Sequence, residues 1–476
     1  MKEAAATTPT SFASSSASAS DYAPRQAASW TSTSGSGFGE SSISDFWMPV
    51  LSASLLITGN TFGAGSLVLP QLAQQPGLAA SSGVFVGAYL MNLLSGLIIA
   101  EVAIQQKENS GTEVPSSFKE LVEENLKSPT LATVISVVSF CVNALVFSFD
   151  MSRVGIVAEQ LSAGLVNAST MSLLWGTSLV TLLTTQSSQR ISNIASVCVS
   201  VLFASFGSLL LPGLAHTDPM AAWTNPGLAA EPMAALGDLA PVILMAMIYQ
   251  NIVPTITRLH NYDRAKTVTS MVIGSAIPLA MYLAWCVACL GGGIDLTRFG
   301  MENGPLLAVF SLATLAGSSI GCGLSCASEL ETFMDKQEGE DDSVIVVAAA
   351  AAAENDDGAV SNKNKNLQDT GFALPASVAT VALPLSLTLA VTNFGNGDLT
   401  PALSVAGGLG SPFLYGVLPV WMAWNQRRQQ EQARAAAATA VPSMVPNSSL
   451  AFLGVFASGM LGTELVEQVD HLAHAL

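Results

Sequence analysis

Residues 57–70 combine glycines with short polar side chains inside a long apolar segment. Glycine weakens a helix, and wherever a helix breaks, backbone N–H and C=O groups lose their intrahelical partners. At membrane depth such groups are tolerated only where protein or a water-filled cavity satisfies them. Freed N–H groups can bind a carboxylate, and freed C=O groups can bind an ammonium group or a cation. The residues that we expect in such a site are Gly59, Asn60, Thr61, Phe62, Gly63 and Gly65.

A second apolar segment contains the polar triplet Tyr249-Gln250-Asn251, followed by Pro254. Proline removes a helical hydrogen bond to the residue four positions earlier, so this segment should break as well. A single break can be a packing kink, but two breaks in corresponding positions point to the binding site of a transporter. We therefore add the triplet to the predicted site, with Phe62 and Tyr249 as walls against an aromatic ring.

The elements that position these residues are apolar helices. The chain of 476 residues is 50% hydrophobic and 11% charged, whereas a soluble protein carries about 25% charged residues. A helix needs about 20 apolar residues to cross a bilayer. The sequence therefore predicts an all-α polytopic membrane protein with about 11 transmembrane helices. They cover about residues 46–69, 82–104, 130–154, 171–186, 192–213, 238–257, 268–290, 305–328, 373–392, 402–424 and 449–466.

The two broken segments are the first and the sixth of this series, so they lie five segments apart. Five is an odd number, and a repeat of five spans must cross the membrane upside down relative to its partner. The spacing therefore predicts a 5+5 inverted repeat with discontinuous helices 1 and 6, and helix 11 as an addition.

Basic residues support this arrangement. If the N-terminus is cytoplasmic, thirteen lysines and arginines fall in inside loops, and only Arg153 and Arg298 fall outside. Cytoplasmic loops of membrane proteins carry an excess of basic residues, so the asymmetry supports both the orientation and the number of spans.

The chain divides by composition into three parts. Residues 1–45 form a Ser/Ala-rich tail that we expect to be disordered, and its composition also fits a targeting segment. Residues 46–428 form the transporter core with helices 1–10, interrupted by a disordered loop at 333–370. Residues 429–476 supply a linker and helix 11. A short amphipathic helix is expected at 115–127, at the membrane surface. The plasma membrane and a plastid or other organelle envelope both remain open as the location.

Charged residues at membrane depth are candidates for function. Asp150 lies in the third segment with Arg153 one turn further on, and Glu101 lies near the end of the second segment. Asp150 and Glu101 are our candidates for proton coupling. The alternatives are a structural ion pair between Asp150 and Arg153, and a capping or surface-reaching carboxylate at Glu101.

Polar and sulfur-containing side chains in the apolar segments have two interpretations. Asn143 either joins helices or lines a cavity, and we include it in the substrate site. Ser318 and Ser319 could join backbone carbonyls around a sodium ion, although small residues also serve close packing. The cysteines fit a packing role, and we expect no other metal site, disulfide framework or cofactor. They are Cys141, Cys198, Cys286, Cys289, Cys322 and Cys326.

Several motifs resemble the tryptophan/tyrosine permease family of the amino acid–polyamine–organocation superfamily. Residues 59–70 (GNTFGAGSLVLP) are similar to its helix 1 signature, and 98–102 (IIAEV) to the end of its helix 2. The resemblance continues through 249–254 (YQNIVP), 273–278 (IGSAIP) with Trp285, and 407–419. It implies secondary transport of aromatic amino acids such as tryptophan or tyrosine by alternating access, usually with proton symport. Members commonly carry histidine where this chain has Gln250, which cannot titrate.

Two other classes of function compete with this interpretation. Residues 395–398 (GNGD), 401–403 (PAL) and Asp263 contain the letters of an intramembrane aspartyl protease, but Asp263 and Asp398 fall on opposite sides of the predicted membrane. An amino-acid sensor of the same fold that transports nothing is the other alternative.

We expect no enzyme, no cofactor and no nucleic-acid partner. The expected partners are an amino acid substrate, a coupling proton or sodium ion, and the lipid bilayer.

Overall fold

The computed structural model describes residues 40–63, 65–110, 118–224, 227–292, 304–349, 372–394, 399, 405–434 and 443–475. One compact unit covers Ser44–Leu476, and the predicted tail lies outside the described residues up to residue 39. This part of the chain is helical, with no β-strand in the ranges just given. The elements are α1 (Glu40–Thr61), α2 (Gly65–Gln74), α3 (Leu78–Ser110), α4 (Phe118–Leu126), α5 (Pro129–Leu161), α6 (Ala168–Thr185), α7 (Ser188–Ala215), α8 (Pro219–Thr224), α9 (Pro232–Ala246), η1 (Gln250–Ile252), α10 (Val253–Leu259), α11 (Arg264–Leu290), α13 (Gly304–Ala349), α15 (Leu374–Phe394), η2 (Ala406–Gly410), η3 (Phe413–Val417), α17 (Leu418–Arg434) and α18 (Asn447–Ala475).

Eight helical segments in the described ranges are long and apolar enough to cross a bilayer. The chain is therefore an all-α polytopic membrane protein, as its composition predicts. The other three predicted spans are also helical, but α1 and α2 are separated by a break, α6 has only 18 residues, and π-helical turns η2 and η3 precede α17. The total of eleven spans stays a prediction.

The first predicted break lies between Thr61, where α1 ends, and Gly65, where α2 begins. Gly59 remains helical, although the sequence places it inside the break. Its role is close packing, because a Cβ atom on Gly317 of α13 would lie 2.6 Å from the carbonyl oxygen of Gly59. Small residues allow membrane helices to approach in this way.

The second predicted break separates α9 from α10. Helix α9 ends at Ala246, a 3₁₀ turn covers Gln250–Ile252, and α10 begins at Val253. Pro254 lies in the first turn of α10, where its missing N–H group has no helical partner to lose. Both helices predicted to be discontinuous are therefore broken in the structure.

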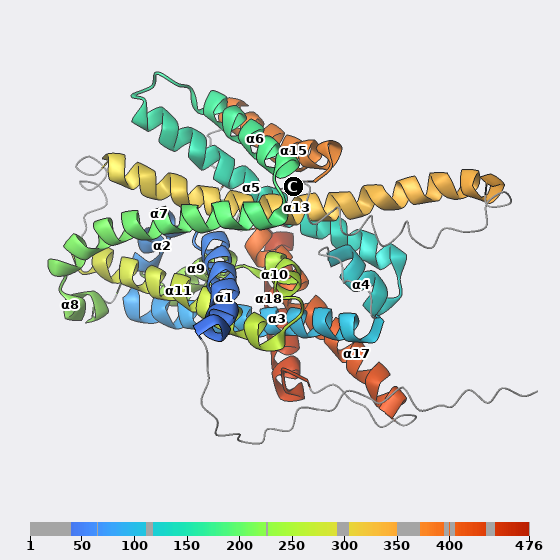
Figure 1. Cartoon of the computed structure of the whole chain (residues 1–476). Coiled ribbons are helices and arrows are strands. Elements are labelled where there is room, and N and C mark those ends of the chain that lie inside the picture. The colour runs from blue at the N-terminus through green and yellow to red at the C-terminus, as the bar shows by residue number, and fades with distance from the viewer. Residues whose placement is uncertain are drawn as a thin grey trace, which may run out of the picture. The chain divides into compact units, whose positions relative to one another are not determined.

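Helix neighbours recur with a shift of five spans. The second span, α3, packs against α9 of the sixth, and the seventh span, α11, packs against α2 of the first. In the same way, the third span, α5, packs against the fourth, α6, and the eighth, α13, packs against the ninth, α15. Polar contacts follow the same rule: Thr58 donates to the carbonyl of Gly274 over 3.1 Å, and Gln250 donates to the carbonyl of Asn92 over 3.2 Å. These pairs are what a repeat of five spans predicts. Helix α13 also packs along α5 (Figure 1).

The short amphipathic helix expected at 115–127 is α4, with Phe118, Leu121 and Val122 buried. Glu329 of α13 accepts hydrogen bonds from the Phe118 amide at 2.6 Å and from the Ser136 hydroxyl of α5 at 2.7 Å. Helix α13 continues to Ala349, beyond the span end predicted near residue 328 and into the loop predicted to be disordered. The rest of that loop, residues 350–370, lies outside the described residues.

Candidate functional site

A cavity lies where the two helix breaks meet α5, α13 and η3. Its walls combine amide, hydroxyl and carboxyl groups with apolar and aromatic side chains. Such a mixture is typical of a small-molecule site, in which a few polar groups fix orientation within an apolar pocket. The lining residues are Asn60, Thr61, Gly63, Asn143, Val146, Phe149, Asp150, Met245, Ala246, Ile248, Asn251, Ser318, Cys322 and Tyr415.

Three asparagine side chains form a continuous hydrogen-bonded chain along this cavity. Asn60 of α1 donates to the side-chain oxygen of Asn251 over 3.0 Å, and Asn251 donates to that of Asn143 on α5, also over 3.0 Å. Asn143 in turn donates to the carbonyl of Ser139 over 2.8 Å. The amides therefore fix both breaks against α5 and reach the cavity surface together.

Two helix C-termini form one wall of the cavity. Thr61 is the last residue of α1, Ala246 is the last residue of α9, and both line the cavity. Carbonyl groups at a helix C-terminus carry negative partial charge. This wall can therefore attract an ammonium group or another cation.

Asp150 supplies a carboxyl group to the same cavity and is only 1% exposed. Ser318 of α13 is its hydrogen-bonding neighbour, and its Oδ2 atom has no partner in the described part of the chain. The Arg153 guanidinium lies over the Phe149 ring, 5.0 Å from its centroid, and makes no ion pair with Asp150. An unpaired buried carboxyl group at a cavity is the arrangement that ligand or proton binding requires.

Glu101, the other candidate for proton coupling, lies away from the cavity. One of its oxygens accepts from Arg427 of α17 at 2.8 Å, and the other accepts from the amides of Met444 and Val445 at 3.0 and 3.1 Å. The carboxylate therefore joins α3, α17 and the segment before α18.

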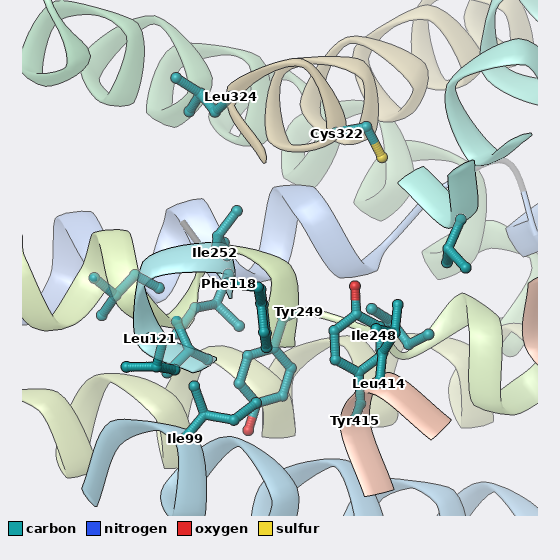
Figure 2. Packing of buried hydrophobic residues seen from close by; sticks show 14 of the residues in the cluster. Ile99, Phe118, Leu121, Ile248, Tyr249, Ile252, Cys322, Leu324, Leu414 and Tyr415 are labelled. Carbon is teal, nitrogen blue, oxygen red and sulfur yellow. The ribbon is translucent and has the colours of Figure 1, made fainter. Parts of the chain in front are cut away.

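The two aromatic residues expected as cavity walls point elsewhere in this structure. Phe62 lies in an aromatic cluster, with its ring centroid 4.6 Å from that of Tyr282 and 5.5 Å from that of Phe206. Tyr249 packs beside Ile99 and Phe118 (Figure 2). Its hydroxyl reaches α3, where a Cβ atom on Gly96 would lie 2.8 Å from it. The rings of Tyr282, Phe206 and Phe310 therefore occupy the space around Phe62.

Gln250 and Ser319 also lie outside the cavity wall. Gln250 donates to the Asn92 side chain of α3 over 2.7 Å, so it fixes the second break to α3. Ser319 accepts a hydrogen bond from Trp175 over 3.3 Å, and only Ser318 of this serine pair lines the cavity. No group of three His, Cys, Asp or Glu side chains suited to a metal ion occurs within the described ranges.

Seven of the residues that line the cavity were not predicted from the sequence as site residues: Val146, Phe149, Met245, Ala246, Ile248, Cys322 and Tyr415. Phe149 immediately precedes Asp150 in the sequence, and this adjacency was the one feature that could have predicted its place in the site. Tyr415 lies in the π-helical turn η3, whose extra residue shifts the direction of its side chain. Figure 2 shows the Tyr415 ring beside Ile248 and Leu414, and its centroid lies 5.8 Å from that of Phe118.

Of the two aspartates that suggested a protease, Asp263 has a structural role. The Asp263 carboxylate accepts the Lys266 amide at 3.1 Å and caps the N-terminus of α11. Asp398 lies outside the described residues.

A family model described as the tryptophan/tyrosine permease family matches residues 48–303. Two curated relatives are each described as a tryptophan-specific transport protein. The one from Pseudomonas aeruginosa (strain UCBPP-PA14) is 26% identical over 249 residues, which is 51% of this chain and 57% of the relative. The one from Shigella flexneri is 25% identical over 302 residues, or 58% of this chain and 70% of the relative. The first match thus spans little more than half of that relative. The region matched by the family model contains both breaks and Asp150.

Proposed function

Because the chain belongs to the tryptophan/tyrosine permease family, we propose that it is a secondary active transporter that carries an aromatic amino acid, such as tryptophan or tyrosine, by alternating access. The observation that carries this proposal is the cavity between the two broken helices. It brings together helix C-termini, the asparagine chain and an unpaired carboxyl group. An amino acid needs both polar anchors and an apolar pocket, and this cavity offers both.

The cavity suggests an orientation for the substrate. The α-ammonium group would face the carbonyl ends at Thr61 and Ala246, where the helix dipoles favour positive charge. The α-carboxylate would face the start of α2, because the N-terminus of a helix carries positive partial charge. Phe149 and Tyr415 are the aromatic groups that line the cavity, so they would contact the substrate ring. Phe62 and Tyr249 would reach the substrate only after a rearrangement of the breaks.

We assign proton coupling to Asp150. A closed apolar cavity disfavours an unpaired carboxylate, so a proton on Asp150 would travel with the substrate while the cavity is closed. The proton would leave when the cavity opens to water on the other side. Glu101 is the weaker candidate, because Arg427 and two backbone amides already hold its carboxylate.

The test is uptake of labelled tryptophan and tyrosine into proteoliposomes that contain the purified protein. An inward proton gradient and an inward sodium gradient are imposed separately. We expect accumulation with the proton gradient, and exchange of internal against external amino acid without any gradient. Binding without exchange would support a sensor, and accumulation with sodium alone would exclude proton symport. Absence of binding and of uptake for every aromatic amino acid would contradict the proposal.

A further inference from the structure

Tyr282 of α11 reaches both helix breaks with one hydroxyl group. The side chain is fully buried, at 0% exposure. Its oxygen lies 3.1 Å from the carbonyl oxygen of Thr61 and 3.3 Å from that of Ala246. These carbonyls belong to the last residues of α1 and α9. The hydroxyl therefore lies at the point where the two half-helices end.

Both carbonyls lie at helix ends, and the Thr61 carbonyl also accepts a hydrogen bond from the Gly63 amide at 3.0 Å. The last carbonyls of a helix have no amide four residues further on within the helix, and each carries negative partial charge. A tyrosine hydroxyl has a single proton, so Tyr282 can donate to only one of the two carbonyls at a time. The Thr61 carbonyl keeps the Gly63 amide in either case, so the Ala246 carbonyl is the one that depends more on the Tyr282 hydroxyl.

The surrounding packing fixes the position of this hydroxyl. The Tyr282 ring lies 4.6 Å from the Phe62 ring and 5.8 Å from the Phe85 ring, measured between centroids. Elsewhere, α11 accepts hydrogen bonds from α1: Ser54 donates to the carbonyl of Ser270 and Thr58 donates to that of Gly274. Helix α11 thus holds α1 along its length and reaches α9 through Tyr282.

We propose that Tyr282 is a positioning residue for transport, whose hydroxyl holds the C-termini of α1 and α9 together in the closed, empty protein. The inference rests on the proposed function. An ammonium group has three donors, so a bound amino acid can satisfy both carbonyls and displace the hydroxyl from them. When the substrate leaves, the Tyr282 hydroxyl bonds to these carbonyls again. It then holds the two half-helices together while the empty transporter returns to its starting state.

Tyr282→Phe removes the hydroxyl and keeps the ring that packs against Phe62 and Phe85. The Ala246 carbonyl then loses the Tyr282 hydroxyl, and the Thr61 carbonyl keeps only the Gly63 amide in the empty protein. The substrate therefore binds more tightly and leaves more slowly. We expect KM and kcat for amino acid uptake to fall together, each by at least fivefold. A role limited to packing would instead lower the amount of folded protein and leave KM unchanged.

The matched control is Tyr89→Phe, the same substitution at a half-buried ring that packs against the same apolar cluster. It should leave both constants within twofold of wild type. Kinetics are expressed per folded protein, measured by size-exclusion chromatography. Unchanged KM and kcat in Tyr282→Phe, or no folded Tyr282→Phe protein, would overturn the assignment of Tyr282 alone, provided that the wild type transports. A wild type that moves no amino acid would contradict the proposed function and, with it, this inference.

Discussion

Asn60 of the first break donates a hydrogen bond to Asn251 of the second break over 3.0 Å, although 191 positions separate the two residues. The two broken helices are therefore joined by their own side chains at the surface of the cavity. A further bond from Asn251 to Asn143 extends the connection to α5. Buried amides that satisfy one another in this way restrict how the breaks can move independently.

Gly321→Ala should disrupt this connection. A Cβ atom at Gly321 of α13 would lie 1.7 Å from Oδ1 of Asn60, a distance that requires the Asn60 side chain or the backbone to move. Overpacking of this kind typically costs about 1–3 kcal/mol, and here it also displaces a cavity residue. We expect at least a tenfold loss of substrate affinity, measured by binding of labelled tryptophan.

Gly323→Ala is the control for that experiment, two residues further along the same helix. Its nearest neighbour, Cδ1 of Leu183, would lie 3.6 Å from the new methyl group, which is ordinary contact. Affinity should stay within twofold of wild type. Equal losses of substrate affinity in both variants would show that any added methyl group on α13 weakens binding. That result would contradict a specific role for Asn60.

Asp150→Asn should separate proton coupling from substrate exchange. The amide keeps the size and hydrogen bonding of the carboxyl group but cannot carry a proton. We expect exchange of amino acid to persist and accumulation driven by a proton gradient to fall at least tenfold. Glu159→Gln, a half-buried site on the same helix, should preserve both activities. Loss of exchange together with accumulation would instead place Asp150 in substrate binding.

Glu101→Gln should destabilise the fold without changing substrate affinity. The variant leaves the Arg427 guanidinium, whose side chain is 13% exposed, without its charged partner. Removal of one member of a buried ion pair typically costs about 3–5 kcal/mol, so the temperature of thermal unfolding should fall.

The contrasting pair is Glu108 with Arg264, whose nitrogen and oxygen lie 3.6 Å apart and whose side chains are 40% and 27% exposed. Exposed pairs contribute about 0–1 kcal/mol. Glu108→Gln should therefore leave the unfolding temperature nearly unchanged. A similar shift for both variants would argue against a special role for the connection made by Glu101.

His260 should make the stability of the protein depend on pH. It lies outside the spanning segments, at the end of α10, with Nε2 2.8 Å from the Ser270 hydroxyl. Its pKa is lowered from 6.5 to about 4, mainly by burial; the charge of Lys266 acts in the same direction, and that of Asp263 opposes it. The unfolded chain thus takes up a proton at a higher pH than the folded protein does. Stability should be fully present above about pH 6.5 and should fall as the pH decreases towards about 4.

Thermal unfolding measured across this pH range tests that expectation. His260→Gln removes the titrating group, so the decrease between pH 6.5 and 4 should become smaller. An identical pH profile for the variant and the wild type would show that other groups cause the acid sensitivity.

The sequence determined the helical class and both breaks, because these depend on local chemistry. Apolar length specifies a spanning helix, and the proline at 254 and the glycines near 63 act on their own backbone. It also identified Asn60, Asn143 and Asn251, the three hydrogen-bonded asparagines at the cavity, since buried amides in apolar segments are rare. That Gly59 remains helical could not be predicted locally, because its packing against Gly317 depends on a helix far away in sequence.

Only the tertiary structure decided where each side chain points. Asn60 and Phe62 are two residues apart, but one joins the cavity and the other joins an aromatic cluster. Asn251 faces the cavity, whereas Tyr249 and Gln250 face α3. Glu101 and Arg427 meet across 326 positions, and Tyr282 meets two carbonyls from other helices. A break in a helix is a local property of the chain, but the partners of the freed groups are set by how distant helices pack.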